Sequence, residues 1–177
     1  IPVSALGRLV LHCVARTDCP HFGLLVGAKA TLQSLRLVGS LMRCAATLGE
    51  ALRLLEIHLR IQNRGAVVHL ERGAVVAVLS YSVYEPAGEG AIHISEGALA
   101  TAMQAIRELC GAELVPSEVL IPRRAPANPE PYRRLFRAPI RFNQERAALV
   151  FPARWLSYPI PSADAAALTA ATSPVLE

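Results

Sequence analysis

The sequence predicts an α+β domain in which a helical amino-terminal half is followed by an antiparallel sheet of hairpins with helices packed against it. Apolar residues near the amino-terminal end recur at three- and four-residue steps, which is the spacing of one helix face. After residue 65 the pattern changes to β-branched runs separated by short turn-like segments, which is typical of paired strands. A chain of 177 residues also has the size of one compact domain.

Two short helices are expected at the amino-terminal end. Ser4 can cap a first helix, which should end near Asp18. Asp18 can cap a second helix, with Pro20 in its first turn and Gly27 as its terminator. The apolar segment 35–43 fits a helix or a strand because periodicity alone does not separate the two, and we favour a helix.

The clearest local signal is a helix start at Thr47-Leu-Gly-Glu50. In this pattern the threonine hydroxyl and the glutamate carboxylate each accept a hydrogen bond from backbone N–H groups at the helix start. The helix should run to about Gln62, with one apolar face formed by Leu48, Leu52, Leu55 and Leu59. Burial of each leucine should contribute about 1.5 to 3 kcal/mol before entropy is subtracted.

Two strands should follow, at residues 67–70 and 75–83, and form a hairpin across the turn-like segment 71–73. The apolar face of the second strand consists of Val75, Ala77, Leu79, Tyr81 and Val83. Serines make the other face more polar toward its end. This pattern suits an antiparallel sheet with helices packed on one face.

The carboxyl-terminal half should alternate helices with short strands. In order, we expect a loop at 86–90, a helix at 95–110 opened by Ser95-Glu96 and ended by Gly111, a strand at 119–121, a short helix from Asn128-Pro129 to Phe136, and a second hairpin of residues 139–142 and 148–151 covered by Trp155 and Leu156. Residues 1–162 would then form the domain, and the alanine-rich residues 163–177 would be a linker.

Composition argues against several classes of protein. Hydrophobic residues make up 53% of the chain, but no apolar run is long enough to span a bilayer and no signal peptide is recognisable. We therefore expect a soluble, cytoplasmic protein. The cysteines are too widely spaced for a zinc site or a disulfide framework and should be reduced and mostly buried: Cys13, Cys19, Cys44 and Cys110.

The net charge of +4 is concentrated in arginines of the carboxyl-terminal half: Arg123, Arg124, Arg133, Arg134, Arg137 and Arg141. Such a cluster could contact the phosphates of DNA. Glu130 and Glu145 lie among these arginines, and no basic recognition helix follows them. A solvated or interface-lining arginine face is therefore favoured over direct contact with DNA.

No motif of a catalytic site is present. The sequence lacks a G-x-S-x-G elbow, a phosphate-binding loop, a G-x-G-x-x-G fingerprint and an H-E-x-x-H pair. The histidines do not have the spacing of a helical metal site, and the adjacent His12 and Cys13 would point in different directions from a helix. We predict a binding module without a metal or cofactor, and not an enzyme.

A ligand pocket remains compatible with the composition, because such pockets are mostly apolar with a few polar groups. The candidate polar lining is His69, Tyr81, Tyr84 and His93, which lie within or beside the first hairpin. The alternative for each of them is a surface aromatic residue or a core histidine with a satisfied hydrogen bond.

Several segments, taken in order, resemble the amino-terminal effector-binding (arabinose-binding-like) domain of AraC-type bacterial transcription regulators: Pro20-His-Phe-Gly-Leu24, Thr47-Leu-Gly-Glu-Ala-Leu52, Tyr132-Arg-Arg-Leu-Phe136 through Ile140-Arg-Phe142, Ala148-Leu-Val-Phe151 and Pro159-Ile-Pro-Ser-Ala-Asp164. The resemblance covers nearly the whole chain. It implies a domain that senses a small-molecule effector, such as an amino acid or organic acid, or that mediates dimerisation. It also implies contact with DNA only through helix-turn-helix units that lie outside this sequence.

Three functions are therefore compared. The leading one is a sensor in a homodimeric regulator, with an allosteric coupling of about 1 to 3 kcal/mol. Its dimer would form through an amphipathic helix such as residues 95–110 or 47–62. The second is a dimerisation or partner-docking domain with no small ligand. The third, a small enzyme with a dispersed active site, is disfavoured because no acid, base and nucleophile set emerges.

Overall fold

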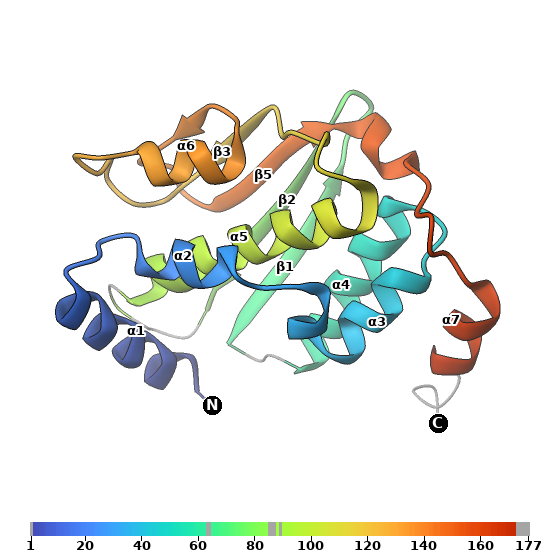
Figure 1. Ribbon diagram of the computed structural model, residues 1–177, viewed down its shortest axis with the longest axis horizontal. Coiled ribbons are helices and arrows are strands. Elements are labelled where there is room, and N and C mark those ends of the chain that lie inside the picture. Colours follow the sequence, from blue (N-terminus) through green and yellow to red (C-terminus); the bar gives the residue numbers. More distant parts are fainter. Residues whose placement is uncertain (1, 63–64, 85–87, 89, 173–177) are drawn as a thin grey trace.

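The computed structural model describes residues 2–62, 65–84, 88 and 90–172. The elements follow one another along the chain (Figure 1) in this order: α1 (Val3–Thr17), α2 (Phe22–Ala28), η1 (Leu32–Leu35), α3 (Leu37–Cys44), α4 (Leu48–Gln62), β1 (Ala66–Arg72), β2 (Val76–Val83), α5 (Gly90–Cys110), β3 (Glu118–Leu120), α6 (Glu130–Phe136), β4 (Ile140–Arg141), β5 (Ala147–Pro152), η2 (Ala153–Ser157) and α7 (Ala165–Thr172). The predicted α+β class is confirmed.

The strands form one mixed sheet in the order β1-β2-β5-β3-β4. β1 and β2 are antiparallel, with Ala66 opposite Val83, so the predicted first hairpin is confirmed. β5 lies antiparallel to β2 and also to β3. The predicted apolar face of β2 is buried at Ala77, Leu79 and Tyr81.

The predicted second hairpin is wrong. β4 pairs in parallel with β3, with Val119 opposite Ile140, and β5 is inserted between β2 and β3. The reason is that β5 is apolar on both sides, and such a strand is stable only in the middle of a sheet. β4 carries the exposed Arg141 and occupies the edge.

Helices cover one face of the sheet (Figure 1). α5 crosses the strands and contacts β2 and β5, while α4 packs along β1. The predicted core face of α4 is confirmed, since Leu48, Leu52 and Leu55 are buried and Leu59 is partly buried against the core. Phe151 and Trp155 stack with ring centroids 5.2 Å apart, so Trp155 closes one end of the core.

α1 ends next to Asp18 as predicted, but α2 begins later than predicted, at Phe22, so Pro20 precedes this helix and does not lie in its first turn. The caps of both helices also differ from the predicted ones. Pro2 takes the N-cap position of α1, and Ser4 lies inside the helix. Asp18 ends α1 in a left-handed conformation at φ 48° and does not cap α2, whose N-cap is His21. Gly27 lies within α2 because it packs against another helix there. A short aspartate tolerates a left-handed backbone, which explains its use as a C-cap.

The segment 35–43 is helical, as favoured from its sequence, but it is broken at Arg36, where φ is 54°. The predicted capping of α4 is also confirmed in part. The Glu50 N–H donates to the Thr47 hydroxyl at 3.3 Å. The Glu50 carboxylate accepts from the N–H of Ala46 at 2.7 Å, one residue earlier than the usual pattern.

α5 begins earlier than predicted, at Gly90, and ends at Cys110 before Gly111 as expected. Ser95 does not cap it, because its hydroxyl donates to the carbonyl of Ala91 one turn back at 2.9 Å. The expected loop at 86–90 lies mostly outside the described residues. Of the four cysteines, Cys110 is buried and the other three have intermediate burial, so the expected burial is complete only at Cys110.

A close backbone contact joins α2 to α5. A Cβ atom on Gly23 would lie 2.1 Å from the carbonyl oxygen of His93, and one on Gly27 would lie 2.2 Å from that of Gly97. Real Cβ atoms do not approach so closely. The two helices can therefore pack at this distance only with glycine at both positions of α2.

Glu56 of α4 covers part of the free edge of β1. Its carboxylate accepts a hydrogen bond from the N–H of Leu70 at 3.3 Å and lies 2.7 Å from Nδ1 of His69. An edge strand otherwise leaves such N–H groups unpaired.

The segment predicted as a linker begins with contacts to the domain. The N–H of Asp164 donates to the carbonyl of Cys44 at 3.0 Å, and the Ser162 hydroxyl donates to that of Arg43 at 2.8 Å. α7 packs against α3. The last residues of the predicted linker, 173–177, lie outside the described part of the chain.

We expect Gly27→Ala to lower the free energy of unfolding by about 1 to 3 kcal/mol, because the added methyl group would collide with the Gly97 carbonyl. Urea denaturation measures this change. Alanine has a higher helix propensity than glycine by about 1 kcal/mol, so a helix without this contact would be stabilised instead. If the urea concentration at the midpoint of unfolding were unchanged or higher in Gly27→Ala, the close packing of α2 on α5 would be contradicted.

Candidate ligand-binding site

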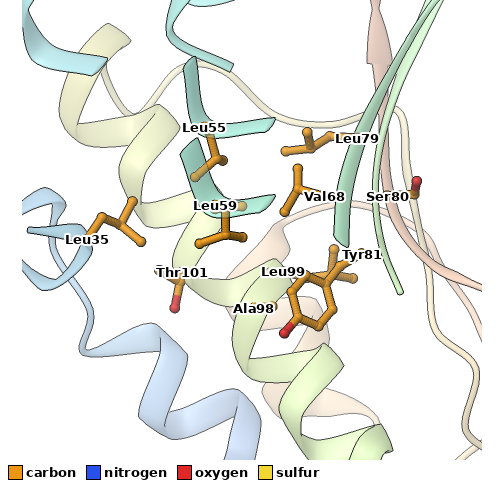
Figure 2. Close-up of a pocket in the computed structure, with 11 residues that line it drawn as sticks. Leu35, Leu55, Leu59, Val68, Leu79, Ser80, Tyr81, Ala98, Leu99 and Thr101 are labelled. Carbon is orange, nitrogen blue, oxygen red and sulfur yellow. The ribbon is translucent and has the colours of Figure 1, made fainter. Parts of the chain in front are cut away.

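A cavity of about 210 Å³ lies between α4, the β1-β2 hairpin and α5 (Figure 2). Leu35 from η1 closes one side of it. The remaining lining residues come from these three parts of the fold: Leu55, Leu59, Val68, Leu79, Ser80, Tyr81, Ala98, Leu99, Thr101 and Ala102. The cavity is therefore bounded by segments that are far apart in sequence.

The described residues that line the cavity are almost entirely apolar, and none of them has a charged side chain. Figure 2 shows Tyr81 reaching from β2 toward α5, and the Ser80 hydroxyl on the other side of the strand. That Ser80 hydroxyl donates to the His69 carbonyl at 3.4 Å. The polar groups that remain for a ligand are the hydroxyls of Tyr81 and Thr101.

Tyr81 is only 8% exposed. Burial raises the pKa of its phenol above the ordinary value, so the group stays neutral and can donate a hydrogen bond. Within the described part of the chain, neither the Tyr81 nor the Thr101 hydroxyl has a hydrogen-bond partner. The buried side-chain atoms that lack a hydrogen-bond partner among the described residues do not include these two hydroxyls, so water can reach them. A ligand in this cavity would replace that water and accept or donate the hydrogen bond itself.

The four nominated residues do not line one cavity. Of them, Tyr81 alone lines the cavity. His69 pairs with Glu56 at the sheet edge, and the side chain of Tyr84 is 69% exposed. His93 is buried on α5, among the polar groups described next.

Sequence reasoning missed the part of the lining that α5 contributes. Ala98, Thr101 and Ala102 recur at three- and four-residue steps beside the leucine stripe of that helix. Small residues at such positions leave room between a helix and its neighbours, and this was the signal that could have identified the cavity wall.

A second feature of α5 is a buried polar cluster, formed by Glu96, Tyr132 and Arg123. The Tyr132 hydroxyl donates to Oε1 of Glu96 at 2.8 Å, and Nε of Arg123 lies 3.1 Å from the same oxygen. Arg123 also donates to the Tyr132 hydroxyl at 2.8 Å and to the carbonyl of Pro20 at 2.6 Å. The cluster therefore joins α5, α6 and the connection between α1 and α2.

Glu96 is completely buried. Burial raises the pKa of its carboxyl to about 7, although Arg123 and the Tyr132 hydroxyl both act to lower it. Its second oxygen, Oε2, lies 3.8 Å from Nδ1 of His93 and has no hydrogen-bond partner among the described residues. The cluster shares no residue with the cavity. Its contacts hold α5, α6 and the connection between α1 and α2 together, which is a structural role.

The described residues contain no group of three or more histidine, cysteine, aspartate or glutamate side chains that could hold a metal ion. Among the helices in the described part of the chain, none combines the length and the apolar character needed to cross a bilayer.

Residues 1–160 match the family model described as the arabinose-binding domain of AraC transcription regulators, at the amino-terminal end. The chain belongs to this family. It is a family of regulatory domains, so the arabinose-binding-like domain described here is not an enzyme. The resemblance inferred from the sequence segments is confirmed.

A solved structure with the same fold is that of the transcriptional regulator CdpR from Pseudomonas aeruginosa. The two share 20% sequence identity with a TM-score of 0.72, over 84% of this chain and 49% of the CdpR chain. This chain therefore spans about half the length of CdpR. No curated protein sequence matches the chain.

The position of α5 limits how this helix could take part in the expected dimerisation. Its apolar stripe, which includes Leu99, Met103 and Ile106, is buried inside the domain. This stripe is therefore not available to a second copy. On α4, the alternative interface helix, Ile57 is 44% exposed.

Glu96 predicts a specific pH dependence of stability. The folded-state pKa of about 7 lies above the ordinary value of 4.5. The stabilisation that the neutral carboxyl provides is therefore fully present below the ordinary pKa and is lost as the pH rises through about 7.

We compare the wild-type domain with the variant Glu96→Gln, whose side chain does not titrate. Between about pH 5 and pH 8, the free energy of unfolding of the wild type should decrease by about 3 kcal/mol more than that of the variant. Urea denaturation at several pH values measures it. If the free energy of unfolding changed with pH in the same way in both proteins, the Glu96 carboxyl would not titrate in this range.

Proposed function

We propose that this domain senses a small, uncharged and mainly apolar effector in the cavity between α4, the β1-β2 hairpin and α5. The observation that carries the proposal is an apolar cavity in which two hydroxyls, those of Tyr81 and Thr101, lack protein partners within the described residues. Apolar walls with a few polar groups are the usual features of a small-molecule site.

The size of the cavity limits the effector. An engineered apolar cavity of about 150 Å³ can hold benzene, and sites for drug-sized molecules begin at about 300 Å³. A cavity of about 210 Å³ suits a molecule between these sizes. A substituted single ring or a short alkyl chain with one hydroxyl or carbonyl group would fit both its volume and its two hydroxyls.

The chemistry of the lining favours an uncharged molecule over the amino acid or organic acid expected from the family resemblance. An ionised carboxylate or ammonium group in this cavity would lose hydration without meeting an opposite charge among the described lining residues. Tyr81 and Thr101 can each supply a hydrogen bond, which is sufficient for one neutral polar group.

A contact route connects the cavity to the end of the described chain. α4 contributes Leu55 and Leu59 to the cavity wall and packs on α3, which contacts α7. A ligand that shifts α4 would therefore change the surface on which α7 lies. Differential contacts of about 1 to 3 kcal/mol are enough for such allosteric coupling.

As part of the same proposal, α7 leads toward helix-turn-helix units that read DNA in the cytoplasm, and two copies of the regulator act as a homodimer. Membership in the AraC family supports this arrangement. Two DNA-reading units held together gain effective concentration at paired sites.

The proposal is tested by thermal unfolding with 2-phenylethanol as the probe, and with sodium benzoate and arabinose as charged and polar comparisons. At a probe concentration about one hundred times its Kd, the unfolding temperature should rise by about 5 to 10 °C. Tyr81→Phe should weaken binding of the alcohol about two- to tenfold, because it removes one hydrogen bond.

Ala102→Leu fills part of the cavity from α5 and should abolish the shift. Ala15→Leu makes the same change at an exposed position of α1 and should leave it intact. Equal shifts in all variants, or a response to arabinose or benzoate alone, would count against this site. No response to any of the three would favour the second function, a dimerisation or docking domain.

A further inference from the structure

A groove of about 530 Å³ lies on the other side of α5, between α2, the last turns of α5 and α6. It shares no lining residue with the cavity. Three arginines line it: Arg107 from α5, Arg134 from α6, and Arg137, which ends α6 in a left-handed conformation. The structure thus brings together cations from two elements, although more than twenty residues separate Arg107 from Arg134 in the sequence.

Within the described residues these three arginines have no acidic partner, a property that they share with several other arginines of the fold, Arg133 among them. Arg43, Arg123, Arg141 and Arg146 each form an ion pair with a glutamate. Within the described residues, no ion pair involves Arg107, Arg134 or Arg137, although Glu130 also lines the groove. One carboxylate against three guanidinium groups leaves an excess of positive charge.

Arg107 is held in place by the protein. Its guanidinium donates to the carbonyl of Leu135 at 2.7 Å and to the side chain of Gln104 at 3.4 Å. Its Nε is buried and has no hydrogen-bond partner among the described residues. Burial lowers the pKa of Arg107, and the nearby positive charge of Arg137 lowers it further. The two guanidinium groups therefore repel each other, and an anion between them would relieve that repulsion.

The walls of the groove limit the kind of anion. Leu25 and Ala28 of α2 and Leu135 of α6 add apolar surface to the cationic lining. A concave site with these walls suits a small molecule better than the broad, convex surface of a DNA duplex. Arginine pairs with carboxylate and phosphate oxygens through two parallel hydrogen bonds, so both groups match the site.

We propose that this groove binds a small dianion, with two carboxylates or one phosphate as its charged groups. Two negative charges balance the excess that remains after Glu130 is counted. The site is separate from the effector cavity and goes beyond the sensing function proposed above. α5 contributes lining residues to both sites. An anion bound to Arg107 would therefore contact the helix that also forms one wall of the effector cavity.

The test is calorimetric titration of the domain at low salt with succinate and, separately, with inorganic phosphate. The variant Arg134→Gln/Arg137→Asn removes two exposed charges and leaves the internal hydrogen bonds of Arg107 in place. Asparagine is chosen at 137 because it tolerates the left-handed backbone there. The control is Arg133→Gln, which removes an exposed charge from α6 outside the groove.

We expect saturable binding of at least one of the two probes, with affinity that falls as salt is added. The double variant should bind about tenfold more weakly or worse, since a hydrogen bond to a charged group contributes about 1.5 to 3 kcal/mol. The control should bind as the wild-type domain does. Binding of succinate alone identifies a dicarboxylate, and binding of phosphate alone identifies a phosphate group.

Three outcomes would overturn the proposal. The first is no saturable binding of either probe up to about 10 mM, which corresponds to an affinity too weak for a built site. The second is an equal loss in the control variant, which would indicate diffuse attraction to a positive surface. The third is unchanged binding of both anions by the double variant, which would show that Arg134 and Arg137 do not form the site.

Discussion

The glycine-mediated contact between α2 and α5 is the constraint on which the remaining architecture depends. Gly23 and Gly27 allow the backbone of α2 to rest directly on carbonyl groups of α5. α5 is thereby held between α2 and the sheet (Figure 1). Because interiors are packed as densely as crystals, a shift of this helix would disturb every surface that it presents.

Three different environments are distributed along α5. Its first half carries the buried Glu96, which is braced by Arg123 and Tyr132. Its middle offers small side chains to the cavity, and its last turns carry Arg107 toward α6. A single rigid helix can keep such different groups at fixed separations, whereas loops could not. The proposed effector cavity and the proposed anion groove are therefore both positioned by one central element.

Local rules recovered most of the elements, but they did not recover how distant segments meet. The leucine face of α4 and the β1-β2 hairpin follow from periodicity and turn residues within short windows. The position of β5 depends on burial on both of its faces, which is a property of the whole sheet. A hairpin with β4 was therefore the natural but incorrect expectation.

The candidate site was less predictable for the same reason. The sequence shows which polar residues lie near the first hairpin. It does not show a cavity, because the empty volume depends on how side chains from distant segments pack against one another. Tyr81 was nominated for its place in the first hairpin, and it lines the cavity because it lies on the buried face of β2. The alanines of α5 carry no chemical signal, and the arginines of the groove meet only through the packing of α6 against α5.

Glu56 has a consequence for how copies of this domain can associate. Its carboxylate accepts a hydrogen bond from the N–H of Leu70 on the outer edge of β1. A strand added at this edge would need the same N–H for its own backbone hydrogen bonds. A neighbouring chain could extend the sheet there only by displacing a charged side chain and its histidine contact. This contact opposes strand addition at the β1 edge of the sheet, so a second copy would meet less resistance at a helical surface than at this edge.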